Sequence, residues 1–373
     1  MKEKFLANSL YVHFPFCRHL CNYCDFFKRV PQSQSEVVDF HSLLEFQKKQ
    51  LDQILFEENV SFGQLKSLYF GGGTPSLWGE SGALFWKQFM IKHQIDLDPN
   101  CEFTMELNPG SWKKSDLEHW KELGLNRISM GMQSLDQRFI KILDRVHNRE
   151  DALETLEMLK QSELNFSVDF MLGLPHSKDF RRDIIAELIE VLKYNPSHLS
   201  LYILTVKSNY VHQKDIPDEE YIEEEYLTVS SFLKEQGFEH YEVSNFAKPG
   251  LRSFHNSQYW KQESTLALGP SATGFLKEAQ LRFKWKESDQ PDIENLNSEE
   301  LKLEKIFLQL RTDMGLSEED FSLESRPTFL KLTRDWQENR QLGEWQNGRF
   351  RLGAKGYLVM DSLLNELMAH ELA

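Results

Sequence analysis

Short apolar runs alternate with amphipathic stretches through the first two thirds of the chain, and this alternation restricts the possible folds most strongly. Apolar runs with few polar positions are typical of strands that are covered on both faces. Strands that alternate with helices form a parallel sheet, because each right-handed crossover returns the chain to run in the same direction. The expected strands are 10–14, 67–70, 102–107, 127–131, 166–172 and 198–204, and the expected helices are 35–56, 85–92, 115–123, 149–160 and 182–192.

Six strand–helix units fit two architectures of the α/β class. One is a partial TIM-like barrel, and the other is an open, doubly wound sheet. Both architectures gather functional side chains at the carboxyl ends of the parallel strands. We therefore look for the site in the segments that follow each expected strand.

The pattern changes after the sixth expected strand. Residues 237–260 are rich in aromatic and polar side chains without helical periodicity, and the chain after Pro291 is rich in Glu, Leu and Lys. We expect a core of 1–236, an aromatic segment of 237–290 that packs on the core, and a small, mostly helical C-terminal domain of 291–373. The last part is expected to contain helices at 297–310, 327–339 and 354–372 and a short strand at 349–352, an order that resembles a winged helix.

The charge balance excludes some functions. The formal net charge is -15, which argues against a dedicated nucleic-acid binder, because such proteins gain affinity by neutralising phosphates. The acidic run 218–225 is interpreted as the solvated start of a helix. No apolar run reaches the roughly 18 residues of a membrane span, and the polar N-terminus does not resemble a signal peptide. These features predict a cytoplasmic protein.

Three of the four cysteines fall within eight positions, as Cys17-Arg-His-Leu-Cys21-Asn-Tyr-Cys24. Three thiolates can hold three corners of an iron–sulfur cubane and leave one iron without a protein ligand. A zinc site is the alternative, because His13 or His19 could supply the fourth ligand of a closed tetrahedron. Cys101 stands alone and is interpreted as a core cysteine.

Polar residues and glycines recur where the expected strands end. Gly71, Gly72 and Gly73 follow the second strand, and glycines let backbone N–H groups approach a ligand closely. Glu106 closes the third strand, Gln133 follows the fourth, and Asp169 lies in the fifth. Together with Arg145, they are expected to border one mouth of the sheet.

The CxxxCxxC spacing after a first strand, followed by three glycines after the second, resembles the radical SAM superfamily. The resemblance implies a partial TIM-like (β/α)6 barrel with a [4Fe–4S] cluster, and S-adenosylmethionine (SAM) on the iron that no cysteine binds. It implies that Cys17, Cys21 and Cys24 hold the cluster. The residues that it implies for SAM are Tyr11, Tyr23, Gly72, Gly73, Thr74, Glu106, Gln133, Arg145 and Asp169.

Longer motifs across the chain resemble the oxygen-independent coproporphyrinogen III dehydrogenase-like group, also called the oxidase-like group. They are Tyr11-Val-His-Phe-Pro-Phe-Cys17, Gly-Gly-Gly-Thr-Pro-Ser at 71–76, Glu-Leu-Asn-Pro-Gly at 106–110, Gly-Met-Gln-Ser at 131–134 and Asp-Phe-Met-Leu-Gly-Leu-Pro at 169–175. The group contains the dehydrogenase HemN and the heme chaperone family HemW.

Three features favour the chaperone family. Phe26 stands where the dehydrogenase typically carries a further cysteine, and only ten residues precede Tyr11. The segment His255-Asn-Ser-Gln-Tyr-Trp260 matches the HNxxYW motif associated with heme binding in HemW. The resemblance therefore implies a heme chaperone with His255 as its heme contact, apo-protein clients such as respiratory proteins, and a reductant protein for the cluster. The segment 268–275 and Lys207 depart from the family pattern on the side expected to face substrate.

Alternatives remain open on the sequence alone. His255 can instead be a hydrogen-bonded histidine, with Tyr259 and Trp260 in the core. The chain can be a coproporphyrinogen III dehydrogenase, in which a SAM-derived radical attacks a propionate side chain of the substrate. It can also be a zinc-stabilised binding protein without redox chemistry.

Overall fold

The computed structural model describes residues 4–33, 35–207, 209–287, 290–370 and 372. Its centre is a nine-stranded sheet with the order β7-β8-β6-β5-β4-β3-β2-β1-β9. The first six strands are parallel, and each pairs with the strand before it in the sequence. They are β1 (Phe5–Phe14), β2 (Val60–Gly72), β3 (Leu97–Leu107), β4 (Arg127–Gln133), β5 (Asn165–Leu172) and β6 (His198–Ile203).

All six expected strands are confirmed, and the α/β class with them. The sheet is extended by β9 (Leu266–Leu268), parallel to β1, and by the antiparallel pair β8 (Asn245–Ala247) and β7 (Glu239–His240). Because β7 and β9 are edges of this order, the sheet does not close into a barrel within the described residues.

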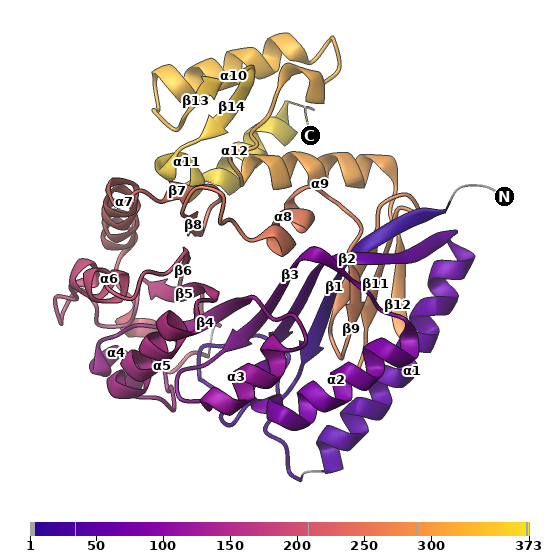
Figure 1. Cartoon of the computed structure of the whole chain (residues 1–373). Coiled ribbons are helices and arrows are strands. Elements are labelled where there is room, and N and C mark those ends of the chain that lie inside the picture. The colour runs from indigo at the N-terminus through magenta and orange to yellow at the C-terminus, as the bar shows by residue number, and fades with distance from the viewer. Residues whose placement is uncertain (1–3, 34, 208, 288–289, 371, 373) are drawn as a thin grey trace.

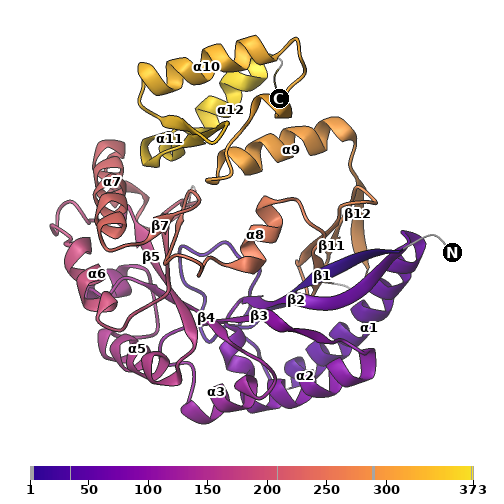
Figure 2. The ribbon, with the colours of Figure 1, turned by 45° about the horizontal axis from the view of Figure 1, so that its top comes forward.

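The helices of the core cover the outer face of the curved sheet, as Figure 2 shows. All five expected helices are present, with shifted ends, and the acidic run begins a further helix, as expected. These helices are α1 (Ser35–Glu57), α2 (Gly79–His93), α3 (Lys114–Lys121), α5 (Arg149–Ser162), α6 (Ile184–Leu192) and α7 (Glu219–Glu235), with the short α4 (Gln137–Ile142) before α5.

Alternation along β2 shows how the strands separate core from site. The ring of Phe70 contacts Trp86 of α2 and Trp120 of α3 at centroid distances of 4.9 and 5.4 Å, so it faces the outer helices. Its neighbour Tyr69 points the other way and meets Glu106. Because side chains alternate along a strand, the apolar core lies outside the sheet and the polar groups lie on its concave side.

One cysteine lies elsewhere in its strand than expected. The sequence placed Cys101 at the start of a strand, but β3 begins at Leu97. Leu97 pairs with Leu65 of β2, and a register shift separates this pair from the pairing that begins at Glu102, so the strand starts before its continuous apolar run. Cys101 is buried and lines a hollow with Lys66 and Arg127, separate from the other cysteines.

The segment 237–290 contains a helix that the sequence did not predict. This helix, α8 (Phe254–Trp260), lies on the concave side of the sheet (Figures 1 and 2). It is only seven residues long, too short for an apolar repeat to reveal it. It is followed by a small antiparallel sheet of β10 (Thr273–Leu276), β11 (Leu281–Trp285) and β12 (Pro291–Asn295). Because β12 pairs with β11, this unit continues past the proposed boundary at 290 to Asn295.

The C-terminal part has the expected order of helix, helix, hairpin and helices. It comprises α9 (Ser298–Leu310), α10 (Arg326–Glu338), the hairpin of β13 (Gly343–Gln346) and β14 (Arg349–Leu352), then α11 (Ala354–Leu358) and α12 (Met360–Ala369). The single helix expected over 354–372 is broken, because Val359 leaves the helical conformation with φ -114° and ψ 15°. Among the described helices, none is long and apolar enough to cross a membrane.

Candidate functional site

The cysteine loop starts where β1 ends and is closed at its base by the backbone. Cys17 N donates to the carbonyl of Arg29 at 2.9 Å, and Arg29 N donates to the carbonyl of Pro15 at 2.8 Å. The loop between these bonds carries Cys21 and Cys24. All three cysteines line one cavity of about 360 Å³ on the concave side of the sheet. The tertiary structure therefore brings the three predicted thiols to one space.

The spread of the three sulfur atoms distinguishes the two metal hypotheses. A tetrahedral zinc ion, with Zn–S bonds of about 2.3 Å, holds its sulfurs roughly 3.8 Å apart. Within the described residues, the three cysteines form no group whose ligand atoms all lie within 4.8 Å of one another, so at least one sulfur pair is wider. His13 is also engaged, at 2.8 Å from the Phe27 carbonyl and 3.1 Å from the Tyr11 hydroxyl. The donor set fits a multi-iron cluster better than one zinc ion.

The glycine loop packs directly on the base of the cysteine loop. Gly73 N donates to the Phe14 carbonyl at 2.7 Å, and Thr74 N donates to the Phe16 carbonyl at 2.8 Å. A Cβ atom on Gly73 would lie 2.6 Å from the Phe16 carbonyl oxygen. Gly72 and Gly73 both line the cavity, but the atoms that approach Gly73 most closely belong to the backbone of the cysteine loop. The sequence argument ascribed this glycine to a ligand, whereas the structure gives it a packing role as well.

A hydrogen-bond chain leads from Arg145 to the first cysteine. Arg145 Nη2 donates to Asn108 Oδ1 at 2.7 Å, and Asn108 Nδ2 donates to Thr74 Oγ1 at 2.8 Å. The Thr74 hydroxyl then donates to Cys17 Sγ at 3.5 Å. Arg145 Nη1 also lies 3.4 Å from the Tyr23 hydroxyl and 4.0 Å from Cys21 Sγ. Burial raises the pKa of Cys17 and of Cys21, and the Thr74 hydroxyl and the Arg145 cation each offset part of that increase.

Glu106 is held at the cavity wall by two donors. The Tyr69 hydroxyl donates to Oε1 and Gly72 N donates to Oε2, both at 3.0 Å. Burial nevertheless raises the pKa of the Glu106 carboxyl to about 7, and the nearby Asp169 carboxylate adds to the increase. Because two like charges meet there, the wall is suited to a ligand that carries a positive charge.

Asp169 and Gln133 complete the expected set in the cavity wall. Asp169 accepts hydrogen bonds from Ser129 at 3.1 Å and Ser167 at 3.3 Å, while burial raises its pKa. Gln133 has the left-handed φ of 70° at the end of β4. The expected residues Tyr23, Gly72, Gly73, Thr74, Glu106, Gln133, Arg145 and Asp169 all line the cavity with the three cysteines.

Further cavity residues were not singled out by the sequence. Inward alternation along the parallel strands could have identified several of them, because positions two apart share a face. The missed residues include Asn108, Arg127, Ser129, His198, Ser200 and Tyr202.

Two expected site residues do not line the cavity. The ring of Tyr11 lies behind the wall, 6.0 Å from the ring of Tyr69 and 6.4 Å from that of His255. His255 is 1% exposed and lies on α8, where Asn256 is the residue that reaches the cavity. Burial lowers the pKa of His255 to about 3, so the ring is neutral. In this conformation His255 is not open to a heme in the cavity.

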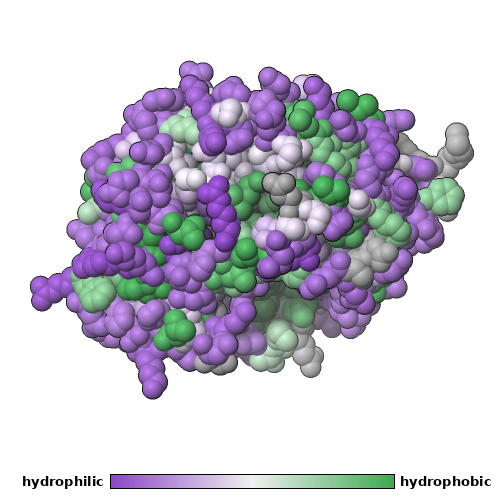
Figure 3. All heavy atoms as spheres, turned by 90° about the horizontal axis from the view of Figure 1, so that it is seen from below, coloured by the Kyte–Doolittle hydropathy of each residue, from purple (hydrophilic) through white to green (hydrophobic). Residues whose placement is uncertain are grey.

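The mouth of the cavity has an apolar element. Phe26 lines the cavity and is 71% exposed, at the position where a further cysteine was the alternative. Figure 3 shows the molecule from below, where apolar patches lie among polar ones and the surface is hollowed near one edge. Exposed apolar side chains beside a cavity are suited to a flat, largely apolar ligand.

Comparison with known proteins agrees with this geometry. Residues 11–189 match the radical SAM superfamily. The chain is 30% identical over 345 residues to the heme chaperone HemW of Lactococcus lactis, covering 87% of each protein. It is 31% identical to radical S-adenosyl methionine domain-containing protein 1, mitochondrial, of Bos taurus, covering 97% of this chain and 87% of that protein.

A solved structure has the same overall fold. Coproporphyrinogen III oxidase (HemN) from Escherichia coli superimposes with a TM-score of 0.75. The match covers 97% of this chain and 90% of that one at 18% identity, so it concerns the fold alone.

Proposed function

Because the chain belongs to the radical SAM superfamily and, within it, to the HemW family of heme chaperones, we propose that it binds heme and delivers it to apo-proteins. The observation that carries this proposal is the similarity to heme chaperones HemW, at 30% and 31% identity over 87% and 84% of the chain. Phe26, in place of a further cysteine, agrees with it.

The superfamily uses a [4Fe–4S] cluster and SAM, and the cavity fits both groups. We propose that Cys17, Cys21 and Cys24 hold the cluster, which supplies an electron when it is reduced. The chain from Arg145 through Asn108 to Thr74 orients a hydroxyl toward Cys17. These donors stabilise negative charge on the sulfur atoms and connect the glycine loop to the cysteine loop.

The opposite wall is proposed to bind SAM, which carries an amino group and a sulfonium charge. Tyr69 and Gly72 fix the carboxylate of Glu106 at the wall, and Asp169 lies near it. Tyr23, Gly73, Gln133 and Arg145 supply the remaining contacts of the proposed set. Tyr11 contributes by packing against Tyr69, since it does not line the cavity.

His255 is the proposed heme contact, and this proposal requires a movement of α8. Among the described atoms, Nε2 of His255 has no hydrogen-bond partner, and an unpaired buried nitrogen costs about 1–3 kcal/mol. Coordination by iron would compensate for that cost. Since the His255 ring is buried, we propose that α8 moves away from the sheet before heme binds.

An anaerobic comparison of two activities tests the function. The cluster-loaded protein is titrated with heme and then mixed with an apo-heme protein, while a parallel sample receives coproporphyrinogen III, SAM and a reductant. A chaperone binds heme at a fixed stoichiometry, transfers it and makes no protoporphyrinogen. Sustained protoporphyrinogen formation without saturable heme binding would instead identify a dehydrogenase.

A further inference from the structure

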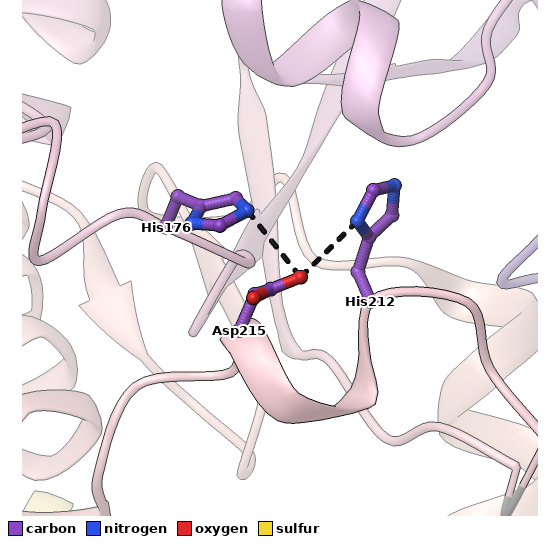
Figure 4. A group of neighbouring side chains, drawn as sticks. All are labelled: His176, His212 and Asp215. Carbon is purple, nitrogen blue, oxygen red and sulfur yellow. Dashed lines mark hydrogen bonds and ion pairs between the residues drawn. The ribbon is translucent and has the colours of Figure 1, made fainter.

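Two histidines and an aspartate converge in the loops that follow β5 and β6, away from the cysteines. Figure 4 shows the imidazoles of His176 and His212 directed at the carboxylate of Asp215 from two sides. His176 Nε2 and His212 Nδ1 each lie 3.4 Å from the same oxygen, Asp215 Oδ2. The three ligand atoms lie within 4.8 Å of one another, and no other described residues form such a group.

The separations match those around a tetrahedral metal ion. Bonds of about 2.0–2.1 Å from zinc to nitrogen and oxygen place neighbouring ligand atoms roughly 3.3–3.4 Å apart. A charge-assisted hydrogen bond would instead be about 2.7–2.9 Å long. The two 3.4 Å separations, which are those of weak hydrogen bonds, are thus already close to the spacing that shared ligation needs.

The surroundings hold the donors in place. The carbonyl of Asp215 accepts from His176 N at 2.8 Å, and Asp215 N donates to the His212 carbonyl at 3.0 Å. Asp179 Oδ2 lies 3.4 Å from His176 Nδ1, the nitrogen that points away from Asp215. A carboxylate on the outer nitrogen is the usual partner of a metal-binding histidine, because it fixes the tautomer that leaves the inner nitrogen free.

We propose that His176, His212 and Asp215 bind a divalent transition-metal ion of the Zn²⁺ class. Two imidazoles exclude Mg²⁺ and Ca²⁺ as preferred ions, since these take oxygen ligands. Heme iron is excluded as well, because the porphyrin leaves it one free position on each face and it cannot accept three protein ligands from one side. The three side chains are 29–35% exposed, so water can complete the coordination.

The ion would join two segments that border the cavity. His176 follows β5, whose Met171 lines the cavity, and Asp215 lies in the 3-10 helix η2 (Gln213–Asp215) after Tyr202 and Thr205, which also line it. A bound ion would hold these two segments at a fixed separation. The inference stands apart from the heme proposal, because neither its ligands nor its test involves heme.

Zinc titration of the cluster-loaded protein tests the site, with a chromophoric chelator as competitor and metal analysis after desalting. We expect one zinc ion per chain with unchanged iron content. His176→Ala, His212→Ala and Asp215→Asn should each lower the affinity by at least about 100-fold, and Asp179→Asn by about tenfold. His119→Ala is the matched control, because His119 Nε2 lies 3.6 Å from Glu80 without a second imidazole.

A second measurement separates ligation from altered folding. Zinc should slow hydrogen exchange in 173–181 and 209–215 of the wild type, and it should not do so in the Asp215→Asn variant. Thermal midpoints of that variant without zinc should equal those of the wild type, because the side chain is partly exposed. Zinc retained by a variant lacking all three donors would overturn the proposal. So would an equal loss of zinc in His119→Ala.

Discussion

Nδ1 of His255 lies 2.9 Å from the hydroxyl oxygen of Ser67, a residue 188 positions earlier in the chain. This contact joins α8 to the concave face of β2 and keeps the imidazole out of the cavity. Glu102 of β3 reinforces it, accepting from the backbone N–H groups of Phe254 and His255 at 2.8 Å each. The carboxylate thus stabilises the start of α8, where the backbone amides leave a partial positive charge.

Heme uptake should therefore be limited by the release of α8. Glu102→Gln removes the charge that holds the helix, which costs about 1 kcal/mol, or roughly fivefold in the opening equilibrium. We expect heme to associate several-fold faster, as followed in the Soret band by stopped flow. Asp218→Asn is the control, because Asp218 caps α7 by accepting from Tyr221 N at 2.9 Å.

The same band tests the ligand itself. His255→Ala should shift the Soret maximum of the bound heme, because loss of an iron ligand changes the spectrum directly. A spectrum identical to that of the wild type would exclude His255 as the heme contact, even if the affinity fell.

The cysteines should separate into two classes by iron content. Replacing Cys17, Cys21 or Cys24 by Ala should remove the cluster, because all three thiols line the same cavity. Cys101→Ala should retain it, since this thiol is buried elsewhere in β3 and burial raises its pKa to about 12. Iron analysis after anaerobic reconstitution measures both, and an iron-free Cys101→Ala protein would contradict the ligand assignment.

Gly73→Ala should impair the cluster as well as SAM binding. The added Cβ would lie 2.6 Å from a backbone oxygen of the cysteine loop, and overpacking of this kind costs about 1–3 kcal/mol. Iron content and calorimetric SAM binding should fall together. Gly353→Ala is the control, because its Cβ would meet nothing closer than 3.9 Å and its φ is -92°. Normal iron with weak SAM binding would assign Gly73 to the ligand alone.

Glu106 should make the SAM-free protein less stable as the pH rises. Its pKa is about 7 when folded and 4.5 ordinarily, so the folded state binds more protons between these values. Stability then falls as the pH rises from 4.5 to 7, by about 2.5 kcal/mol for this group, and by about 3 kcal/mol in all once the pH is well above 7. Glu106→Gln should therefore stabilise the protein at pH 8 but not at pH 4.5, as measured by urea unfolding. Equal effects at both values would contradict the raised pKa, and the exposed Glu122→Gln is the control.

Much of the candidate site followed from spacing alone. The three cysteines sit within one loop, so their meeting needs only local chain geometry. Glu106, Gln133 and Asp169 are close together because parallel strands carry their carboxyl ends to the same edge. Strand order was not predicted, since a barrel and a doubly wound sheet were both left open, and the structure shows that each of the first six strands neighbours its predecessor.

The sequence by itself determined the α/β class, the six parallel strands and the loop that carries three cysteines, because hydrophobic period and spacing along the chain are local features. Only the tertiary structure decided the place of α8, since seven residues show no repeat and their position depends on Ser67 and Glu102 far away in the chain. It likewise decided the spread of the sulfur atoms and the convergence of His176 with His212. Both depend on how loops that are far apart in the chain pack against one another, and the spacing of residues in the sequence does not reveal that packing.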